Sequence, residues 1–408
     1  MPDVSFNNLL VVSAIAAIAP LLLGFAPGLR IPSIVLEIVA GIVVGPSVLG
    51  WVHVDLPVSI LALLGLTFLL LLAGLEIDLH RLRGRLLATA LIGFGITIVL
   101  ASGAAVGFAS VGWLSSPLIV ATAFCATGLG LVVPVLKDAG QADSDVGQTT
   151  IAGSSVADFG AVLLLSFLFS MSGGGTGARI VLVLAFALLV VVTAVVLMQS
   201  GRSMRLGDVI LRLQDTTAEI RVRFAVLLLI AFAVLAERFG LESILGAFVA
   251  GALIGALDKD SSSHPHLRTK LEAIGYGFLV PVFFVVSGLR LDLSGLMQNP
   301  GALVRVPLFL LALLVARGVP AALYLPALGR KATVAAALLQ ATSLPFIVAA
   351  TQIGVETGRL SPVNAAALVC AGLLSVLIFP PVALGLLRGP HGRQTPADRP
   401  AYQSGGSV

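Results

Sequence analysis

Long apolar runs separated by short polar loops fill the chain from residue 8 to residue 387. A helix that crosses a bilayer needs roughly 20 apolar residues, and about 17 suffice in places, so the pattern predicts about thirteen spanning helices. These are residues 8–28, 31–50, 57–77, 86–110, 116–136, 146–170, 178–199, 222–239, 241–257, 269–288, 301–325, 330–354 and 361–387. The sequence therefore predicts an all-α polytopic membrane protein.

Composition agrees with this pattern. Of the 408 residues, 58% are hydrophobic and only 11% are charged, whereas soluble domains carry about 25% charged residues. The formal net charge of +4 does not indicate nucleic acid as a partner, because the basic residues lie in short loops between apolar runs. The two cysteines fall inside apolar runs and indicate neither a disulfide framework nor a metal site. We expect no enzyme activity and no cofactor.

The loops predict an orientation. If alternate loops lie on opposite sides, one side holds 18 of the 24 Lys and Arg residues, the other holds five, and Arg317 lies within a span. Cytoplasmic loops carry the excess of positive charge. The expectation is a multi-pass protein of the cell's inner (plasma) membrane, with the N-terminus outside and a polar cytoplasmic tail at 388–408.

The chain repeats itself weakly. Three motif pairs occur in the same order at offsets of 210, 214 and 215 residues. They join 39–45 with 249–255, 73–79 with 287–293, and 125–129 with 340–344. The matched spans are an odd number of crossings apart, so the two halves enter the membrane from opposite sides. This predicts one transmembrane domain, 1–387, in which a linker helix (178–199) joins two inverted six-helix repeats (8–170 and 222–387), as in many secondary transporters.

Two predicted spans contain helix-breaking residues at matching places. The fifth carries Thr127 and Gly128 with Pro134 beyond them, and the twelfth carries Thr342 and Pro345. Broken helices at a repeat interface form the substrate sites of transporters. Unwinding would expose carbonyl and hydroxyl oxygens at Thr127 and Thr342 as ligands for a dehydrated cation. The alternative is a pair of ordinary kinks whose freed backbone groups are hydrogen-bonded by Ser and Thr side chains.

Asp158 is an acid near the middle of the sixth predicted span, about 18 Å from its start. A carboxylate at that depth is costly and is a functional hypothesis by default. Ser154 and Ser155 precede it by four and three residues and share its helical face. We interpret Asp158 as a site that takes a proton and a small cation in turn, with the serines as supporting ligands. A structural acid, and serines that serve helix packing, are the alternatives.

Arg317 is the only cation well inside a predicted span. A guanidinium is not deprotonated in proteins, so Arg317 cannot carry the proton. We expect it to balance the negative helix ends and nearby carboxylate charge; a structural counter-charge or a snorkelling side chain is the alternative. Four further acids, Glu37, Glu76, Asp78 and Asp138, lie nearer the cytoplasmic ends of their spans. For Glu76 and Asp78 we expect a solvated interface role, whereas Glu37 is placed to line a cytoplasmic funnel.

Several stretches together resemble the cation:proton antiporter superfamily, in particular its second branch. They are Ile31-Pro32 with Glu37-Ile-Val-Ala-Gly41 and Gly45-Pro46, Leu72-Ala-Gly-Leu-Glu-Ile-Asp78, Ala126-Thr127 with Val132-Val-Pro134-Val-Leu-Lys137-Asp138, Gly246-Ala-Phe-Val-Ala-Gly251, and Pro281-Val-Phe-Phe284 with Gly288-Leu-Arg-Leu-Asp292. The resemblance implies a thirteen-helix fold with crossed broken helices, a homodimer, and elevator-type alternating access. It also implies that Asp158 is the cation- and proton-binding residue and that Arg317 is the family's basic residue before the second break.

The chain departs from that family in two places. Ala157 stands where electrogenic members have a second acid, and the second break reads Ala341-Thr-Ser-Leu-Pro345 instead of a Gly-Glu-Phe-like stretch. We therefore predict electroneutral exchange of one monovalent cation for one proton across the bilayer, and the sequence does not separate Na⁺ from K⁺ or Li⁺. The alternatives are a sodium-coupled organic-anion symporter on a related fold and a non-transporting membrane sensor module. An intramembrane aspartyl protease would need two facing carboxylates.

Overall fold

The computed structural model describes residues 6–25, 32–76, 84–169, 219–257 and 266–387, together with 185–186, 188–190 and 192–193. Every secondary-structure element in these ranges is helical, so the predicted all-α class is confirmed for them. Three predicted features lie outside the described residues: most of the linker helix 178–199, the residue Asp78, and the tail 388–408.

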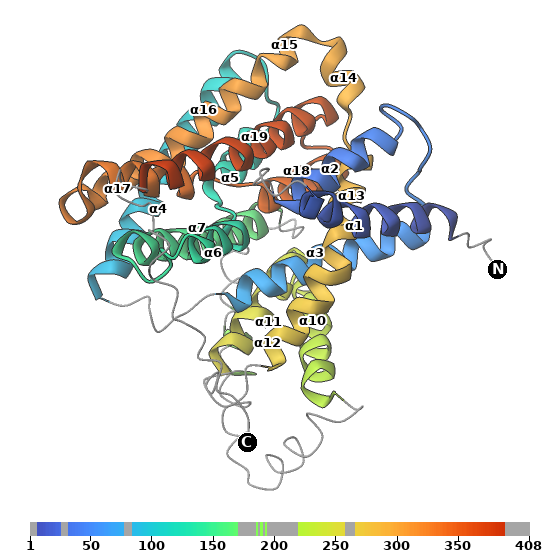
Figure 1. Ribbon diagram of the computed structural model, residues 1–408, viewed down its shortest axis with the longest axis horizontal. Coiled ribbons are helices and arrows are strands. Elements are labelled where there is room, and N and C mark those ends of the chain that lie inside the picture. Colours follow the sequence, from blue (N-terminus) through green and yellow to red (C-terminus); the bar gives the residue numbers. More distant parts are fainter. Residues whose placement is uncertain are drawn as a thin grey trace, which may run out of the picture.

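The helices follow the predicted spans closely (Figure 1). They are α1 (Asn7–Phe25), α2 (Ser33–Val44), α3 (Leu56–Leu75), α4 (Gly84–Ser110), α5 (Pro117–Cys125), α6 (Leu129–Asp138), α7 (Asp145–Phe169), α10 (Ile220–Arg238), α11 (Ser243–Leu257), α12 (His266–Ile274), η1 (Gly275–Leu279), α13 (Val280–Leu289), α14 (Leu293–Gln298), α15 (Pro300–Leu303), α16 (Arg305–Gly318), η2 (Val319–Tyr324), α17 (Leu325–Gln340), α18 (Pro345–Glu356) and α19 (Pro362–Leu387).

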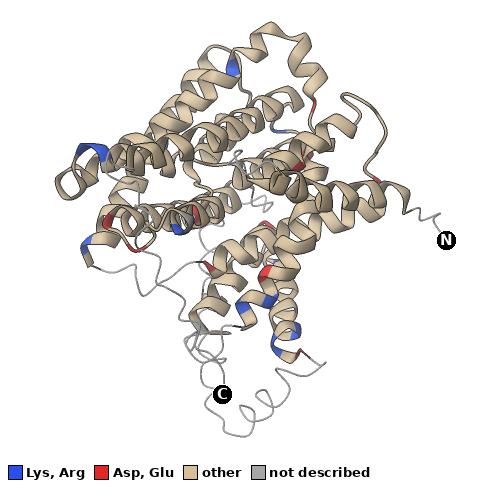
Figure 2. Cartoon of the chain, in the orientation of Figure 1, with Lys and Arg blue, Asp and Glu red and all other residues tan. Residues whose placement is uncertain are grey.

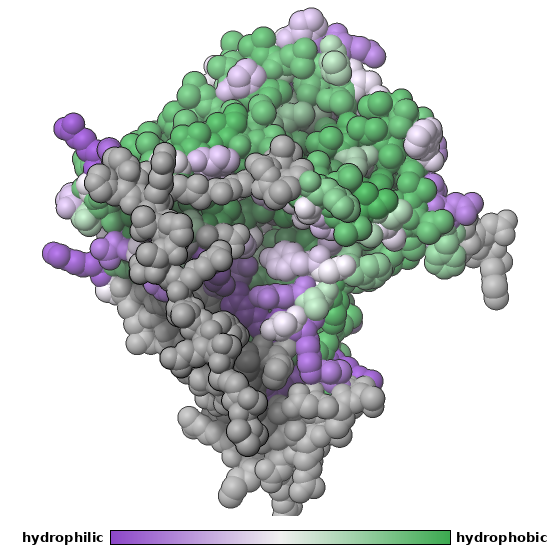
Figure 3. Space-filling model, viewed as in Figure 1, coloured by the Kyte–Doolittle hydropathy of each residue, from purple (hydrophilic) through white to green (hydrophobic). Residues whose placement is uncertain are grey.

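Eight helical segments of the described residues are long and apolar enough to cross a membrane, and the shorter α2 and α11 are also apolar. One of the eight, Pro300–Glu356, covers the places of two predicted spans. Charged residues lie mainly at helix ends (Figure 2), and the face shown in Figure 3 is largely hydrophobic over the upper helices. The chain is thus a multi-pass membrane protein.

Two helical groups are defined by their packing. In the first, here called the scaffold bundle, α3 packs on α11 and α13, α2 on α13, and α10 on α11. In the second, the site bundle, α4 packs on α5 and α7, α7 on α17, and α19 on α16, α17 and α18. Each bundle combines helices from both halves of the sequence, as the internal repeat predicts. Figure 1 shows the site bundle in the upper left of the view.

Matched glycines explain the repeated motifs. Gly41 of α2 lies against Gly288 of α13, and a Cβ on Gly41 would overlap the carbonyl oxygen of Val285. In the corresponding crossing, a Cβ on Gly74 of α3 would overlap the carbonyl oxygen of Phe248, and one on Gly251 of α11 would overlap that of Leu71. Small residues let helix backbones approach closely in lipid. The glycines of one repeat therefore create the contact surface for the other.

The two predicted helix breaks are present. α5 ends at Cys125, Ala126 is extended, and α6 begins at Leu129. α17 ends at Gln340, and α18 begins at Pro345, where proline is suited because a first-turn residue needs no intrahelical N–H bond. Pro134, which was expected to help break the fifth span, lies inside α6. It lacks the N–H that would bond to the carbonyl of Gly130, and both residues line a cavity, where that carbonyl can be hydrated.

Three spans differ from prediction in detail. α2 is only 12 residues long and ends at Val44, where the chain turns and the carbonyl groups of Val43 and Val44 bond to the turn. The tenth span contains a π-helical segment, η1, between α12 and α13. The eleventh ends in a 3₁₀ segment, η2, just after Arg317. Such local changes of helix type depend on tertiary packing and give no periodic signal in the sequence.

Candidate functional site

Asp158 lies on α7 beside the first helix break. Its Oδ1 accepts a hydrogen bond from the backbone N–H of Thr127 at 2.8 Å, and its Oδ2 accepts one from the N–H of Leu129 at 3.2 Å. The side chain is 7% exposed. Thr127 lies in the unwound segment and Leu129 is the first residue of α6, whose positive helix end also faces the carboxylate. Within the part of the chain that the structure describes, this buried carboxylate has no charged partner in contact and is held by two main-chain donors.

Arg317 reaches the same break through a hydroxyl group. Its Nε donates to Thr127 Oγ1 at 2.9 Å, an Nη also donates to this hydroxyl, and Nη1 donates to Thr97 Oγ1 at 3.3 Å. Within the described residues, no ion pair joins Arg317 to Asp158. Thr127 therefore links the two charged groups, with its backbone N–H on the acid and its hydroxyl on the base.

The two breaks touch each other. The Thr127 hydroxyl donates to the carbonyl oxygen of Gln340, and the N–H of Gly128 donates to that of Thr342, both at 2.8 Å. The Thr342 hydroxyl bonds back to the carbonyl of Leu338 in its own helix. The end of α5 thus meets the end of α17, and the crossing of the two interrupted helices lies directly beside Asp158.

The two serines predicted to support Asp158 are both buried, at 0% exposure for Ser154 and 3% for Ser155. Ser154 Oγ has no hydrogen-bond partner within the described residues. The same holds for Ser343 Oγ in the second break. An orphaned buried hydroxyl is costly, and one helical turn from a carboxylate it is a free oxygen ligand or donor.

Three residues that shape this junction could not be singled out from the sequence. The Thr97 hydroxyl of α4 accepts a hydrogen bond from Arg317, and the Gln340 carbonyl accepts one from the Thr127 hydroxyl. Ser375 of α19 accepts from the N–H of Ser343 and donates to its carbonyl. Each makes its contact across a large sequence distance, and a threonine, glutamine or serine in an apolar run has many ordinary uses.

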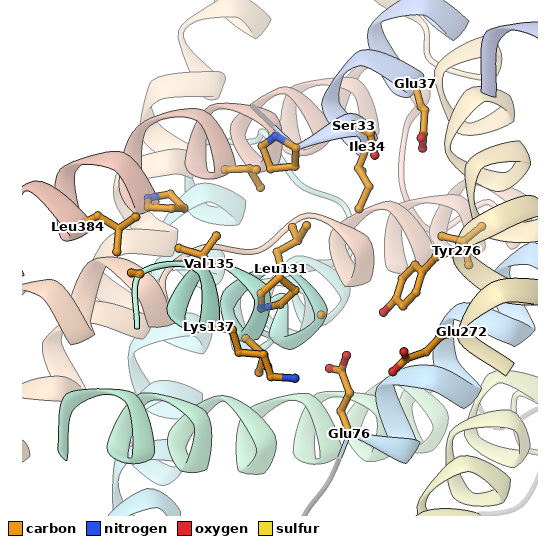
Figure 4. Close-up of a pocket in the computed structure, with 18 of the residues that line it drawn as sticks. Ser33, Ile34, Glu37, Glu76, Leu131, Val135, Lys137, Glu272, Tyr276 and Leu384 are labelled. Atoms are coloured by element: carbon orange, nitrogen blue, oxygen red, sulfur yellow. The ribbon is translucent and has the colours of Figure 1, made fainter. Parts of the chain in front are cut away.

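A cavity of about 950 Å³ reaches the junction from one side. Its lining includes Gly130 and Leu131, which adjoin the N–H that holds Asp158, and the acids Glu37, Glu76 and Glu272 (Figure 4). Its basic lining residues are Lys137 and Arg268, and Tyr276 of η1 also faces it. Glu37 lines this cavity, as expected for a funnel residue. On the other side, a pocket of only about 90 Å³ lies between α13 and α18.

This geometry defines a class of protein. A multi-pass membrane fold places one acid and one base at the crossing of two interrupted helices, with a cavity open to one side. Interrupted helices that meet inside the membrane are typical of secondary transporters, in which they bind the substrate.

The family follows from comparison with known proteins. Residues 13–386 match the sodium/hydrogen exchanger transmembrane family. The chain is 31% identical over 396 residues to a putative Na⁺/H⁺ antiporter, YjbQ, of Bacillus subtilis, covering 93% of this chain and 63% of that protein. It is 27% identical to the Na⁺/H⁺-K⁺ antiporter GerN of Bacillus cereus, over 86% of this chain and 89% of that protein. The chain belongs to the sodium/hydrogen exchanger transmembrane family, which is a family of transporters and not of enzymes.

A solved structure shares the fold. The sodium proton antiporter MjNhaP1 of Methanocaldococcus jannaschii superposes with a TM-score of 0.63, covering 93% of this chain and 97% of that one, at 18% sequence identity.

Proposed function

We propose that the chain exchanges a monovalent cation, Na⁺ or K⁺, for H⁺, and that Asp158 binds the two in competition. The observation that carries the proposal is the position of the Asp158 carboxylate, which is buried at the crossing of the two breaks and held by two main-chain N–H groups. The similarity to YjbQ, a putative Na⁺/H⁺ antiporter, and to GerN, an Na⁺/H⁺-K⁺ antiporter, supports the activity.

Oxygen atoms around Asp158 suit a small dehydrated cation. Ser154 offers an uncommitted hydroxyl one turn away, and the broken helix ends offer carbonyl groups. Thr127, Thr342 and Ser155 support the site: Thr127 through its backbone and hydroxyl, Thr342 through its carbonyl, and Ser155 through its small buried side chain. Arg317 holds Thr127 in place and supplies a fixed positive charge.

Fixed charge favours electroneutral exchange. Arg317 stays protonated, and Ala157 beside Asp158 adds no second carboxylate, so one acid takes either one cation or one proton. An imposed membrane potential without a pH gradient should then drive no exchange in proteoliposomes. Potential-driven transport would refute the one-for-one stoichiometry.

The wider arrangement belongs to the same proposal. It comprises thirteen spans in two inverted repeats, a homodimer, an elevator-type motion of the site bundle against the scaffold bundle, and an N-terminus outside the cell. Because the 950 Å³ cavity is on the side of the Lys- and Arg-rich loops, the structure then corresponds to an inward-open state.

Cavity size alone also admits a small organic molecule. The charged lining, with three acids against two basic residues, favours a cation over an organic anion.

The test uses a pH-sensitive dye in proteoliposomes with an acidic lumen. Na⁺, K⁺ and Li⁺ are added in turn to the parent chain and to Asp158→Asn. Cation-dependent dequenching that is lost in the variant is the expected result. Equal dequenching in both would move the site away from Asp158, and none in the folded, inserted parent would point to another substrate.

A further inference from the structure

An ion pair joins the two bundles on the side of the small pocket. Arg290 directly follows α13, and its Nη1 lies 3.0 Å from Glu356 Oε1 at the end of α18. Arg290 also donates to Ser59 Oγ of α3, and Gln352 donates to the same Glu356 oxygen. Because α13 packs on α2 and α3 while α18 packs on α5 and α19, the contact crosses from the scaffold bundle to the site bundle.

This pair accompanies the closed side of the molecule. Arg290, Gln352 and Glu356 line the pocket of about 90 Å³. The cavity of about 950 Å³ lies toward the other end of α3, at Glu76, and α3 is about 30 Å long. The bundles are thus tied together beside the small pocket, and the large cavity lies toward the other end of α3.

The internal repeat relates the two sides. At the offset of 214 residues, the counterpart of Arg290 is Glu76. At the offset of 215, the counterpart of Gln352 is Lys137, and Gln352 lies one helical turn before Glu356. Beside the small pocket, the scaffold residue Arg290 is basic and the site-bundle residue Glu356 is acidic. At the large cavity the signs are reversed: Glu76 at the end of α3 is acidic and Lys137 on α6 is basic.

Glu76 and Lys137 face the open cavity. Both line it (Figure 4), Glu76 at the end of α3 and Lys137 in the last turn of α6. Within the described residues, Glu76 Oε2 is buried without a hydrogen-bond partner, and the Lys137 side chain is exposed. α6 packs on α7 of the site bundle and also touches α3, with the Glu76 carboxylate near Gly130 in the first turn of α6. The acid and the base thus line the same cavity from α3 and α6.

We propose that Glu76 and Lys137 form an ion pair when the cavity closes, and that this pair replaces Arg290–Glu356 as the tie between the bundles. The inference rests on the alternation of access that the proposed function requires. Each pair stabilises one of two states, and a conformational equilibrium shifts by the difference in stabilisation.

The test traps the closed cavity with a disulfide. Cys125→Ala and Cys370→Ala remove the native thiols, and Glu76→Cys with Lys137→Cys places two thiols on the facing positions. After oxidation, the remaining thiols are counted by the gel shift that maleimide-polyethylene glycol produces. Adding Glu356→Gln breaks the Arg290 pair and should raise the disulfide yield roughly two- to fivefold, the range for an ion pair between exposed side chains.

A matched control removes a similar ion pair that does not cross the bundles. Lys270 of α12 and Glu219 just before α10 pair at 2.8 Å, with comparable exposure and outside the cavity lining, so Glu219→Gln should leave the yield unchanged. The exchange Arg290→Glu with Glu356→Arg should return the yield to the parent value. An unchanged yield in Glu356→Gln, or a raised yield that the exchange does not reverse, would overturn the inference.

The disulfide yield is measured without transport, so the two proposals fail separately. A yield that responds as expected in a chain that exchanges no cation would refute only the antiport. Dye dequenching that responds to cations, together with an unresponsive yield, would refute only the paired ties.

Discussion

At the scale of single residues, Thr127 has the largest number of separate tasks. Its N–H holds Asp158, and its hydroxyl accepts from Arg317 and donates to the carbonyl of Gln340. The backbone hydrogen bond to Asp158 is retained in any substitution other than proline, whereas the hydrogen bonds of the hydroxyl are lost unless the new residue also has a hydroxyl. The two contributions of this residue can therefore be separated by experiment.

Replacing Thr127 by valine keeps the shape and removes the hydroxyl. Arg317 then loses the acceptor for two of its N–H groups, which costs about 1–3 kcal/mol for a buried donor. We expect Thr127→Val to lower the unfolding temperature in detergent and to slow cation-dependent dequenching.

Thr127→Ser is the control, because it retains the hydroxyl and should keep both properties near those of the parent. If valine and serine behaved alike, the hydroxyl bridge to Arg317 would have no part in stability or transport.

At the scale of elements, the helix crossings of the scaffold bundle depend on glycine. Gly41 and Gly288 meet at one crossing, and Gly74 and Gly251 hold the corresponding places at the other. A methyl group there would overlap main-chain atoms, which cannot move away as a flexible side chain can. Overpacking of this kind costs about 1–3 kcal/mol.

Gly41→Ala should therefore lower the unfolding temperature. The control is Gly103→Ala on α4, where a Cβ would meet no atom within 4 Å and where alanine is favoured over glycine by about 1 kcal/mol in a helix. Fluorescence-monitored thermal unfolding of both variants measures the difference. Equal effects would show that the glycine crossings do not limit the packing of α2 on α13.

Elements and site were predictable to different extents. The apolar runs gave the helices, and Thr127-Gly128 and Thr342 to Pro345 gave the places of the breaks, because these signals are local. Pro134 does not mark the break, which falls between Cys125 and Leu129, with Pro134 inside α6. The bridge from Arg317 through Thr127, the support from Thr97, and the π-helical segment at Tyr276 arise from tertiary contacts that no local pattern encodes.

At the scale of the whole molecule, there are two bundles, each with helices from both halves of the chain, and the buried Asp158 lies in the site bundle. The cavity approaches Asp158 from one side, and the Arg290–Glu356 pair joins the bundles beside the small pocket on the other. Movement of the site bundle against the scaffold bundle would close the large cavity and open the other side, while the contacts around Asp158 stay unchanged. Such a rigid motion suits a carrier in which one carboxylate serves both substrates.

The most direct measurement is the release of protons when cations bind. The purified chain in weakly buffered detergent solution is mixed with a pH indicator and titrated with Na⁺, K⁺ or Li⁺. At a starting pH low enough for Asp158 to be protonated, competition predicts roughly one proton released per chain at saturation, since a cation ligand must be deprotonated, and no release from Asp158→Asn. Undiminished release from Asp158→Asn, or cation binding by calorimetry without any proton release from the parent, would contradict exchange at this carboxylate.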